Sequence, residues 1–219
     1  MNYVKSFVKR TGKFTDAQKK AYNLLAEDFI IPFSESYLNF NNVFNNSQNT
    51  VLEIGFGSGI ATAQIAQTNP DINYLGIEVH KPGIGHLLWE IENRSLKNIR
   101  IIEYDAVDVV KKMIPALSLK AIHIFFPDPW PKKRHRKRRL IQRPFTNALA
   151  ACLKPEGYLY FVTDWEDYAQ HALEELTATE GLKNAYADFA PTQSWRPTTR
   201  FEQKGLDKEH EIRELLFNS

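Results

Sequence analysis

Residues 50–180 alternate between short apolar, β-branched runs and segments with helical spacing, and this alternation limits the folds open to the chain. The runs predict strands at residues 50–54, 73–79, 99–104, 121–126 and 158–163, and the spacing predicts helices at 60–67, 83–95, 106–113, 141–153 and 165–180. Strands and helices in this order build a parallel sheet covered on both faces. We therefore predict an α/β fold with a Rossmann-like, doubly wound sheet. Ligands of such sheets lie beyond the carboxyl ends of the strands.

The flanking segments divide the chain into two parts. Residues 1–45 predict a basic arm followed by a helix, which begins at an N-cap Thr15 and reaches about residue 27. An Asn- and Ser-rich break at 41–49 leads into the main domain, residues 46–219. Residues 210–217 predict a late strand at the edge of the sheet.

Composition narrows the class of protein. The chain has 219 residues, 43% of them hydrophobic and 25% charged, which is typical of a globular domain. It has no apolar run long enough for a membrane span, and the basic N-terminus has no apolar signal core. A single cysteine, Cys152, excludes a disulfide within the chain and fits a reducing compartment. We expect a cytoplasmic protein with no membrane partner.

A glycine loop follows the first predicted strand. Residues 53–59 read Glu-Ile-Gly-Phe-Gly-Ser-Gly, which differs from the G-x-G-x-x-G of dinucleotide sites and lacks the Lys-Ser/Thr of a phosphate-binding P-loop. Glu78 ends the second strand, where a carboxylate can accept hydrogen bonds from ribose hydroxyls, and Asp105 follows the third. Glu53 lies at the start of the loop, where it can meet a cationic part of a ligand.

Three acidic residues around one loop favour a nucleoside that carries positive charge. S-adenosylmethionine, with its sulfonium and ammonium groups, is such a ligand. NAD is the alternative ligand, and a structural turn with solvated carboxylates is the alternative without one.

A proline-rich turn ends the fourth predicted strand. Residues 126–131 read Phe-Pro-Asp-Pro-Trp-Pro, and the prolines restrict the backbone on either side of Asp128. Asp128 is expected to face the ligand, and Trp130 offers a flat face on which a base can stack. The alternative is a buried tryptophan under the loop with an incidental surface aspartate.

A basic run follows this turn without a linker. Residues 132–139 contain seven Lys and Arg residues and no acidic one. Because the whole chain has a formal net charge of +2, the remaining residues carry a net charge of −5. Such a focused patch favours contact with nucleic acid, chiefly through phosphates, over a solvated helix start or a targeting signal.

These motifs together resemble the bacterial tRNA (guanine-N7)-methyltransferases. The residues that carry the resemblance are Leu-Glu-Ile-Gly-Phe-Gly-Ser-Gly at 52–59, Gly-Ile-Glu at 76–78, Phe-Pro-Asp-Pro-Trp-Pro-Lys-Lys-Arg-His at 126–135 and Thr-Arg-Phe-Glu at 199–202. The resemblance covers about residues 50–217 and implies the seven-stranded sheet of class I S-adenosylmethionine-dependent methyltransferases. It also implies tRNA as the partner, the variable-loop guanine as the target and S-adenosylhomocysteine as the product.

The resemblance implies a role for each motif residue. Asp128 is the catalytic residue. The cofactor site is lined by Glu53, Gly55, Gly57, Gly59, Glu78, Asp105 and Asp128. The target nucleotide is contacted by Lys132, Asp164, Thr199, Arg200, Phe201 and Glu202, the last four in a loop over the site. The tRNA is contacted by Arg134, His135, Arg136, Lys137, Arg138 and Arg139.

Several alternatives stay open at the level of sequence. Asp164 either shares the guanine contact or caps the helix that follows it. The enzyme could instead methylate another RNA, a protein or a small molecule, or the chain could be an RNA-binding module without catalysis. The histidines show no metal-ligand spacing, so we predict no metal, and we expect a monomer or homodimer.

Overall fold

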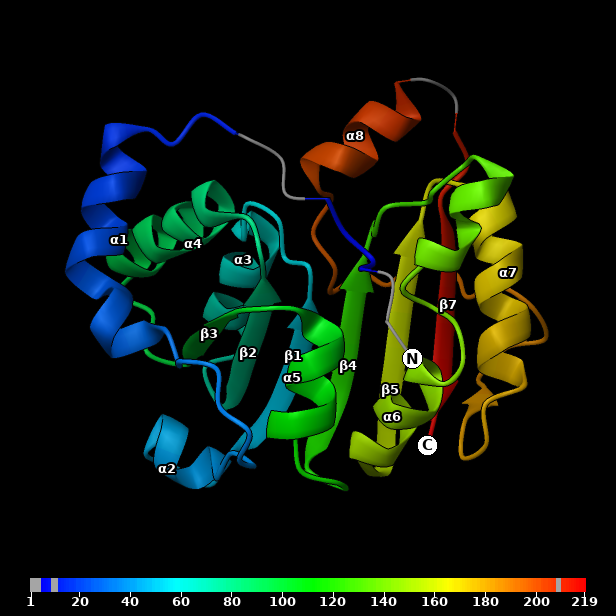
Figure 1. Ribbon diagram of the computed structural model, residues 1–219, viewed down its shortest axis with the longest axis horizontal. Coiled ribbons are helices and arrows are strands. Elements are labelled where there is room, and N and C mark those ends of the chain that lie inside the picture. The colour runs from blue at the N-terminus through cyan, green and yellow to red at the C-terminus, as the bar shows by residue number, and fades with distance from the viewer. Residues whose placement is uncertain (1–4, 9–11, 208–209) are drawn as a thin grey trace.

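The structure is a computed structural model that describes residues 5–8, 12–207 and 210–219 and, for residues 200, 201 and 204, the backbone alone. Within these ranges a seven-stranded sheet forms the centre, with strand order β3-β2-β1-β4-β5-β7-β6 (Figure 1). The strands are β1 (Asn49–Ile54), β2 (Ile72–Glu78), β3 (Ile99–Glu103), β4 (Leu119–Phe125), β5 (Leu153–Thr163), β6 (Lys183–Asn184) and β7 (Arg213–Asn218). Strands β1 to β5 pair in parallel, and β7 runs antiparallel to β5 and β6. The predicted α/β fold and its doubly wound sheet are confirmed.

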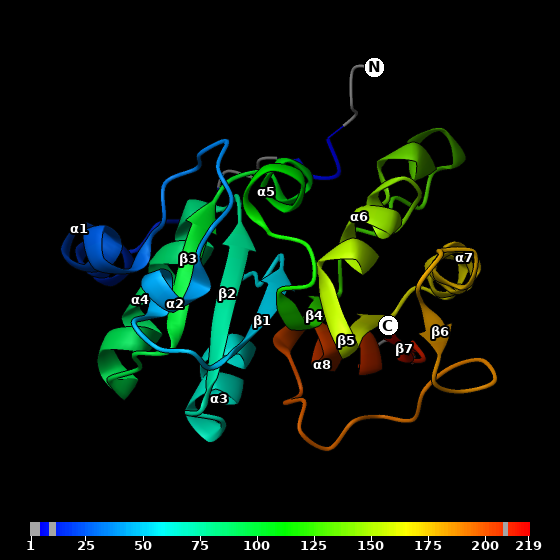
Figure 2. The same cartoon turned by 90° about the horizontal axis from the view of Figure 1, so that it is seen from below.

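Helices cover both faces of the sheet. They are α1 (Asp16–Phe29), α2 (Phe40–Phe44), α3 (Ile60–Thr68), α4 (Lys81–Arg94), α5 (Ala106–Met113), α6 (Phe145–Cys152), α7 (Glu166–Thr177) and α8 (Arg200–Leu206), with a 3-10 helix η1 (Lys133–Arg138). Figure 2 shows α5, α6 and α7 on one face and α3 on the other, and side chains of α4 share the core of the α3 face. Helix α1 packs on the outside of α4. None of the helices in the described ranges is long and apolar enough to cross a membrane.

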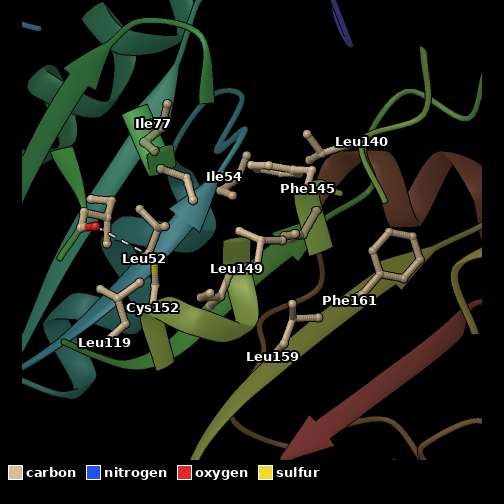
Figure 3. Packing of buried hydrophobic residues seen from close by; sticks show 14 of the residues in the cluster. Leu52, Ile54, Ile77, Leu119, Leu140, Phe145, Leu149, Cys152, Leu159 and Phe161 are labelled. Atoms are coloured by element: carbon tan, nitrogen blue, oxygen red, sulfur yellow. Dashed lines mark hydrogen bonds between the residues drawn. The ribbon is translucent and has the colours of Figure 1, made fainter. Parts of the chain in front are cut away.

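Each face has its own hydrophobic core because side chains alternate along a strand. Leu52 and Ile54 of β1 lie in the core beneath α6, where Phe145 and Leu149 pack (Figure 3), whereas their neighbour Val51 lies in the core on the α3 side. Full burial of one such side chain stabilises the fold by about 1.5–3 kcal/mol. Cys152 lies in the first core, and burial raises the pKa of its thiol to about 11.

The strand ends set the geometry of the functional edge. In the β4–β5 pairing, Phe125 lies opposite Val162, so the residues that follow β4 and β5 leave the sheet at the same level. The amide of Phe126 donates a hydrogen bond to the carbonyl of Val162 at 2.8 Å and extends this pairing by one residue. The same edge carries the ends of β1, β2 and β3, because all five strands are parallel.

Several predicted boundaries are confirmed, and others move. Helix α5 has the predicted bounds, and Thr15 is the N-cap of α1 in a capping box with Gln18. Helix α6 begins at Phe145 and not at 141, after a turn in residues 141–144. Strand β5 begins at Leu153, earlier than predicted, and a register shift in β4 between Leu119 and Ala121 absorbs the extra residues.

Three predictions about segments outside residues 50–180 are wrong. Strand β7 is not an edge strand, because the short β6 pairs with its outer side. The predicted break at 41–49 contains most of helix α2, which begins after an Asn39 side chain that caps it. The predicted loop over the site at 199–202 forms the start of helix α8, as described below.

Candidate active site

The glycine loop after β1 leaves its backbone open at two points. Gly55 and Gly57 adopt φ values of +77° and +58°, and a Cβ built on either would meet no atom within 4 Å. Gly59, at φ +70°, differs because a Cβ there would lie 2.6 Å from Leu87 Cβ of α4. Gly59 therefore lets the loop pack on α4, while Gly55 and Gly57 leave space above the backbone for a ligand.

Glu78 holds the loop in this shape. Its Oε2 accepts a hydrogen bond from the Gly57 amide at 2.9 Å, and its Oε1 accepts from the amides of Val79 at 2.7 Å and His80 at 3.1 Å. Burial raises the pKa of Glu78 although these three bonds oppose the shift. The carboxylate predicted to bind ribose thus also orders the loop that would approach the ligand.

Glu53 is a buried acid beside the loop. Glu53 is only 3% exposed. It lies near the end of β1, between Gly76 of β2 and His123 of β4. Burial raises the pKa of Glu53 to about 7, and the Glu78 carboxylate contributes to the increase. A cation near this group would favour its ionised form.

Asp105 lies at the end of β3 as predicted and has a second role. It is the N-cap of α5, and its Oδ1 accepts a hydrogen bond from the Val107 amide at 3.0 Å. Burial raises the pKa of Asp105, while the Val107 bond and the charge of Lys5 lower it.

The turn that carries Asp128 is held in an uncommon conformation. Phe126 and Trp130, on either side of it, have φ values of +48° and +47°, which side-chain-bearing residues rarely adopt. Such conformations persist where the surroundings hold them, often at functional sites. Here the Pro129 carbonyl accepts a hydrogen bond from Arg139 Nε at 3.0 Å, and the Trp130 indole donates to the Ser6 carbonyl at 3.1 Å. Asp128 itself is half-buried.

Trp130 matches neither sequence interpretation completely. It is half-buried, as the packing alternative suggests, but it borders the basic run and the N-terminal arm. The Arg138 guanidinium lies over its ring at 5.1 Å from the centroid, and His135 meets the ring edge-on. The stacking of a base on Trp130 stays a prediction. The Arg138 guanidinium already lies over the Trp130 ring.

The basic run forms η1, and most of its charges face solvent. The exposed residues are Lys132, Lys133, Arg134, Arg136 and Lys137, and His135 and Arg138 are half-buried. Arg139 is the exception, since its side chain is 1% exposed and pairs with Asp167 of α7. Arg139 therefore lies outside the exposed basic surface. Its burial contradicts the predicted contact of Arg139 with tRNA. Its guanidinium instead fixes the Pro-Asp-Pro-Trp turn.

Asp164 lines a pocket at the end of β5 and does not cap α7. The N-cap residue of α7 is Trp165, whose amide donates to Thr163 Oγ1 at 3.2 Å. The pocket has a volume of about 550 Å³ and is lined by Asp164, Trp165, Glu166, Asp167, His210, Glu211 and Arg213. Asp164 Oδ2 lies 3.2 Å from His210 Nδ1. The helix-cap alternative for Asp164 is therefore wrong.

Thr199 and Glu202 form the capping box of α8. Thr199 Oγ1 accepts from the Glu202 amide at 3.0 Å, and Glu202 Oε2 accepts from the Thr199 amide at 3.2 Å. Arg196 binds the same carboxylate through Nη1 at 2.5 Å and Nη2 at 2.8 Å. Glu202 is thus committed to the fold. The side chains of Arg200 and Phe201 lie outside the described part of the structure.

The Arg196 network was missed by sequence reasoning. Besides Glu202, Arg196 binds Glu214 Oε1 of β7 at 2.7 Å and the Tyr160 hydroxyl of β5 at 3.3 Å. The Tyr160 hydroxyl in turn donates to Glu214. Glu214 directly follows Arg213 and precedes the apolar residues 215–217, so the local sequence does not mark it as the partner of a buried arginine.

Other features of the described residues lie outside this site. A cavity of about 330 Å³ is found at the opposite edge of the sheet, where Thr50 and Lys154 begin β1 and β5. Across the described part of the chain, no three His, Cys, Asp or Glu side chains come together in a group that could hold a metal ion.

Known proteins share both sequence and fold with this chain. A family model described as "Putative methyltransferase" matches residues 47–215. The tRNA (guanine-N(7)-)-methyltransferase of Nitrosomonas eutropha is 49% identical over 214 residues, which cover 98% of this chain and 96% of the relative. The protein of the same name from Nitrosospira multiformis is 47% identical, with 98% of this chain and 93% of the relative covered.

Solved structures agree at the level of fold. An antibiotic-related methyltransferase superposes with a TM-score of 0.56 at 16% identity, covering 82% of this chain and 90% of that one. The 16S rRNA methyltransferase KamB gives a TM-score of 0.55 at 14% identity, covering 100% and 99%. These identities show a shared fold alone, whereas the near full-length matches at 47–49% identity show a family. This chain belongs to the family of the tRNA (guanine-N(7)-)-methyltransferases.

Proposed function

We propose that this protein transfers the methyl group of S-adenosylmethionine to N7 of a guanine in tRNA. One observation carries the proposal: the strained turn with Asp128 joins the end of β4 directly to the exposed basic residues of η1, beside the glycine loop of the neighbouring strand β1. A reaction centre and a polyanion-binding surface are thus contiguous. The names of the relatives identify the same reaction class.

The residues at the glycine loop fit S-adenosylmethionine. The space above Gly55 and Gly57 would admit a nucleoside, and Glu53, Glu78 and Asp105 lie at the carboxyl ends of the neighbouring strands β1, β2 and β3. Burial holds the pKa of Glu53 near 7, so a sulfonium or ammonium nearby would favour its ionised form. S-adenosylmethionine supplies the methyl group as an electrophile on sulfur. These three acidic residues offer no positive charge to the pyrophosphate of a dinucleotide.

Asp128 is assigned the catalytic role as a positioning and charge-stabilising carboxylate. Guanine N7 has an in-plane lone pair and no proton, so the reaction requires no general base. Positive charge develops on the guanine as the new N–C bond forms, and a fixed carboxylate nearby stabilises it. Asp128 would also orient the base through its amino edge, which lowers the entropic part of the barrier.

The target nucleotide is assigned to the neighbouring strand end. Asp164 follows β5 at the level at which the Asp128 turn follows β4, and Lys132 lies between that turn and η1. Thr199, Arg200 and Phe201 begin α8 above the same edge (Figure 1). Glu202 is assigned an indirect role, since its carboxylate already holds Arg196 and the N-terminus of α8.

The tRNA is assigned to the exposed face of η1. Lys133, Arg134 and Lys137 present their charges to solvent, and His135 and Arg138 border them. Arg136 is also exposed, but its Nη2 pairs with Asp167 Oδ1 at 2.8 Å. Such side chains bind phosphates and set the register of the nucleic acid on the protein. The protein is proposed to act in the cytoplasm as a monomer or homodimer, and the basic arm and first helix, residues 1–45, to precede a methyltransferase domain at 46–219.

Methyl incorporation tests the function. Purified protein is incubated with methyl-labelled S-adenosylmethionine and bulk tRNA, and the tRNA is digested to nucleosides. We expect label in 7-methylguanosine. Label in another nucleoside, in protein or in a small molecule would assign a different substrate, and tRNA binding without label would support an RNA-binding module.

A further inference from the structure

The Asp164 carboxylate is held by a histidine that no motif of the sequence points to. His210 lies just before β7 in the chain, and its Nδ1 is 3.2 Å from Asp164 Oδ2. Both side chains are about one-third exposed and line the pocket at the end of β5. A carboxylate can only accept, so His210 donates this hydrogen bond through a proton on Nδ1.

A second contact confines the same carboxylate. Gly205 in the last turn of α8 lies against Asp164, and a Cβ at Gly205 would be 3.1 Å from Asp164 Oδ2 and 3.2 Å from Asp164 Cβ. The Gly205 carbonyl accepts a hydrogen bond from the His210 amide at 3.0 Å. Asp164, Gly205 and His210 are therefore packed together where three elements meet.

The two carboxylate oxygens of Asp164 have different surroundings. Oδ2 is bound by His210 and flanked by Gly205, while Oδ1 forms no hydrogen bond with any residue that the structure describes. A carboxylate with one oxygen fixed presents the other in a defined direction to a donor on a base. Trp165 meets the His210 ring edge-on, with the two ring centroids 6.4 Å apart.

We propose that His210 is a positioning residue that holds Asp164 for contact with the amino edge of the target guanine. The inference rests on the proposed function, because it assigns the pocket beside Asp164 to the guanine. His210 acts through Asp164 and does not touch the reacting atoms. The remaining charged groups of the pocket are Glu166, Asp167, Glu211 and Arg213, of which Arg213 pairs with Glu211 at 2.7 Å.

A pair of substitutions separates positioning from simple packing. His210→Phe keeps a ring of similar size and removes the donor, whereas His210→Asn keeps a donor near the position of Nδ1. We expect His210→Phe to lower kcat/KM for tRNA by about tenfold or more, since one oriented bond to a charged group is lost. His210→Asn should recover most of it, with S-adenosylmethionine affinity and Tm unchanged in both. Equal loss in the two variants would overturn the proposal.

A double-mutant cycle tests whether the effect passes through Asp164. In an Asp164→Leu background, which removes both acceptor oxygens, His210→Phe should lower kcat/KM by less than about twofold, because contacting residues in one hydrogen-bond network are not additive. A further tenfold loss in that background would contradict the inference. His171→Phe is the matched control. His171 is half-buried on α7, lies outside the pocket lining, and has its Nε2 3.0 Å from the Ile141 carbonyl oxygen.

A spectroscopic readout keeps the inference separate from the function. The ¹⁵N shifts of His210 should show the Nδ1–H tautomer in the wild type and lose that preference in Asp164→Leu. An unchanged tautomer in Asp164→Leu would sink the positioning claim even in an active enzyme. If the wild type yields no 7-methylguanosine, the proposed function fails, and the guanine assignment of this pocket fails with it.

Discussion

Arg196 and Glu202 form a two-pronged ion pair, with Nη1 to Oε2 at 2.5 Å and Nη2 to Oε1 at 2.8 Å. Their side chains are 1% and 7% exposed, so the pair is buried beneath α8. Because Arg196 also binds Glu214 and Tyr160, it ties the start of α8 to strands β5 and β7. The helix that carries Gly205 against Asp164 is thus anchored to the sheet from below.

Because of this anchoring, we predict that the main effect of replacing Glu202 is a loss of folding stability. Glu202→Ala should lower the free energy of unfolding by about 3–5 kcal/mol, the usual effect of breaking a buried pair from one side. Thr199→Ala should lower it by about 1 kcal/mol, because it removes only the N-cap of α8. Urea unfolding measures both. A Glu202→Ala protein of wild-type stability with lost activity would instead assign Glu202 to direct substrate contact.

Glu53 predicts a dependence of stability on pH. Its folded pKa of about 7 lies above the usual value of 4.5, so the folded state binds more protons than the unfolded state between these limits. Stability from this group is therefore full at low pH and is lost as the pH rises through 7, by about 3 kcal/mol in total. Glu53→Gln removes the effect.

The comparison with Glu53→Gln isolates one group. Buried His123, whose pKa burial lowers to about 3, changes stability in the opposite direction over part of this range and is present in both proteins. The difference in unfolding free energy between wild type and Glu53→Gln, measured from pH 5 to 8, should shift in favour of the variant. A constant difference would show that Glu53 is ionised throughout.

The glycine loop allows a matched pair of substitutions. Gly59→Ala places a methyl group 2.6 Å from Leu87 Cβ at a positive φ, and we expect a loss of about 3 kcal/mol from strain and crowding together. Gly55→Ala carries the backbone strain alone, about 1–2 kcal/mol, because its methyl group enters open space. Calorimetric titration should then show that Gly55→Ala weakens S-adenosylmethionine binding, since that space is the proposed ligand site. Unchanged binding would move the ligand elsewhere.

The basic run should divide into two kinds of residue. Lys133→Ala and Lys137→Ala should each reduce the slope of log affinity for tRNA against log salt by about 0.7–0.9, at unchanged stability. Arg139→Ala should leave that slope unchanged and lower stability by about 1–3 kcal/mol, because it removes the bonds to Pro129 and Asp167. Filter binding over a salt series and urea unfolding measure the two effects. A reduced slope in Arg139→Ala would return that residue to the RNA surface.

Local signals were sufficient to predict the five parallel strands β1 to β5. The periodicity of residues 50–180, the Thr15 N-cap and the glycine loop depend on neighbours in sequence, and the structure has them as predicted. The short β6 and the internal position of β7 are set by pairing with distant strands, for which two residues give no pattern. Helix α8 was predicted as a loop because its seven residues are too few for a clear helical period.

The site was predictable in outline only. Motif positions at strand ends identified Asp128 and Asp164, because parallel strands bring their carboxyl ends to one edge. The partners of these residues could not be read in the same way. Arg139 looks like its neighbours in the basic run, but it is buried in contact with Asp167 and Tyr168 of α7, which are distant in sequence. His210 likewise becomes relevant through a contact 46 residues away in sequence.

The role of Asp128 is the central claim, and single-turnover methyl transfer in Asp128→Ala tests it most directly. With labelled S-adenosylmethionine and tRNA, we predict a rate of 7-methylguanosine formation at least about a hundredfold below wild type, as for loss of one preorganised electrostatic group. The dissociation constant for S-adenosylmethionine should change little. A wild-type rate in Asp128→Ala would contradict the account.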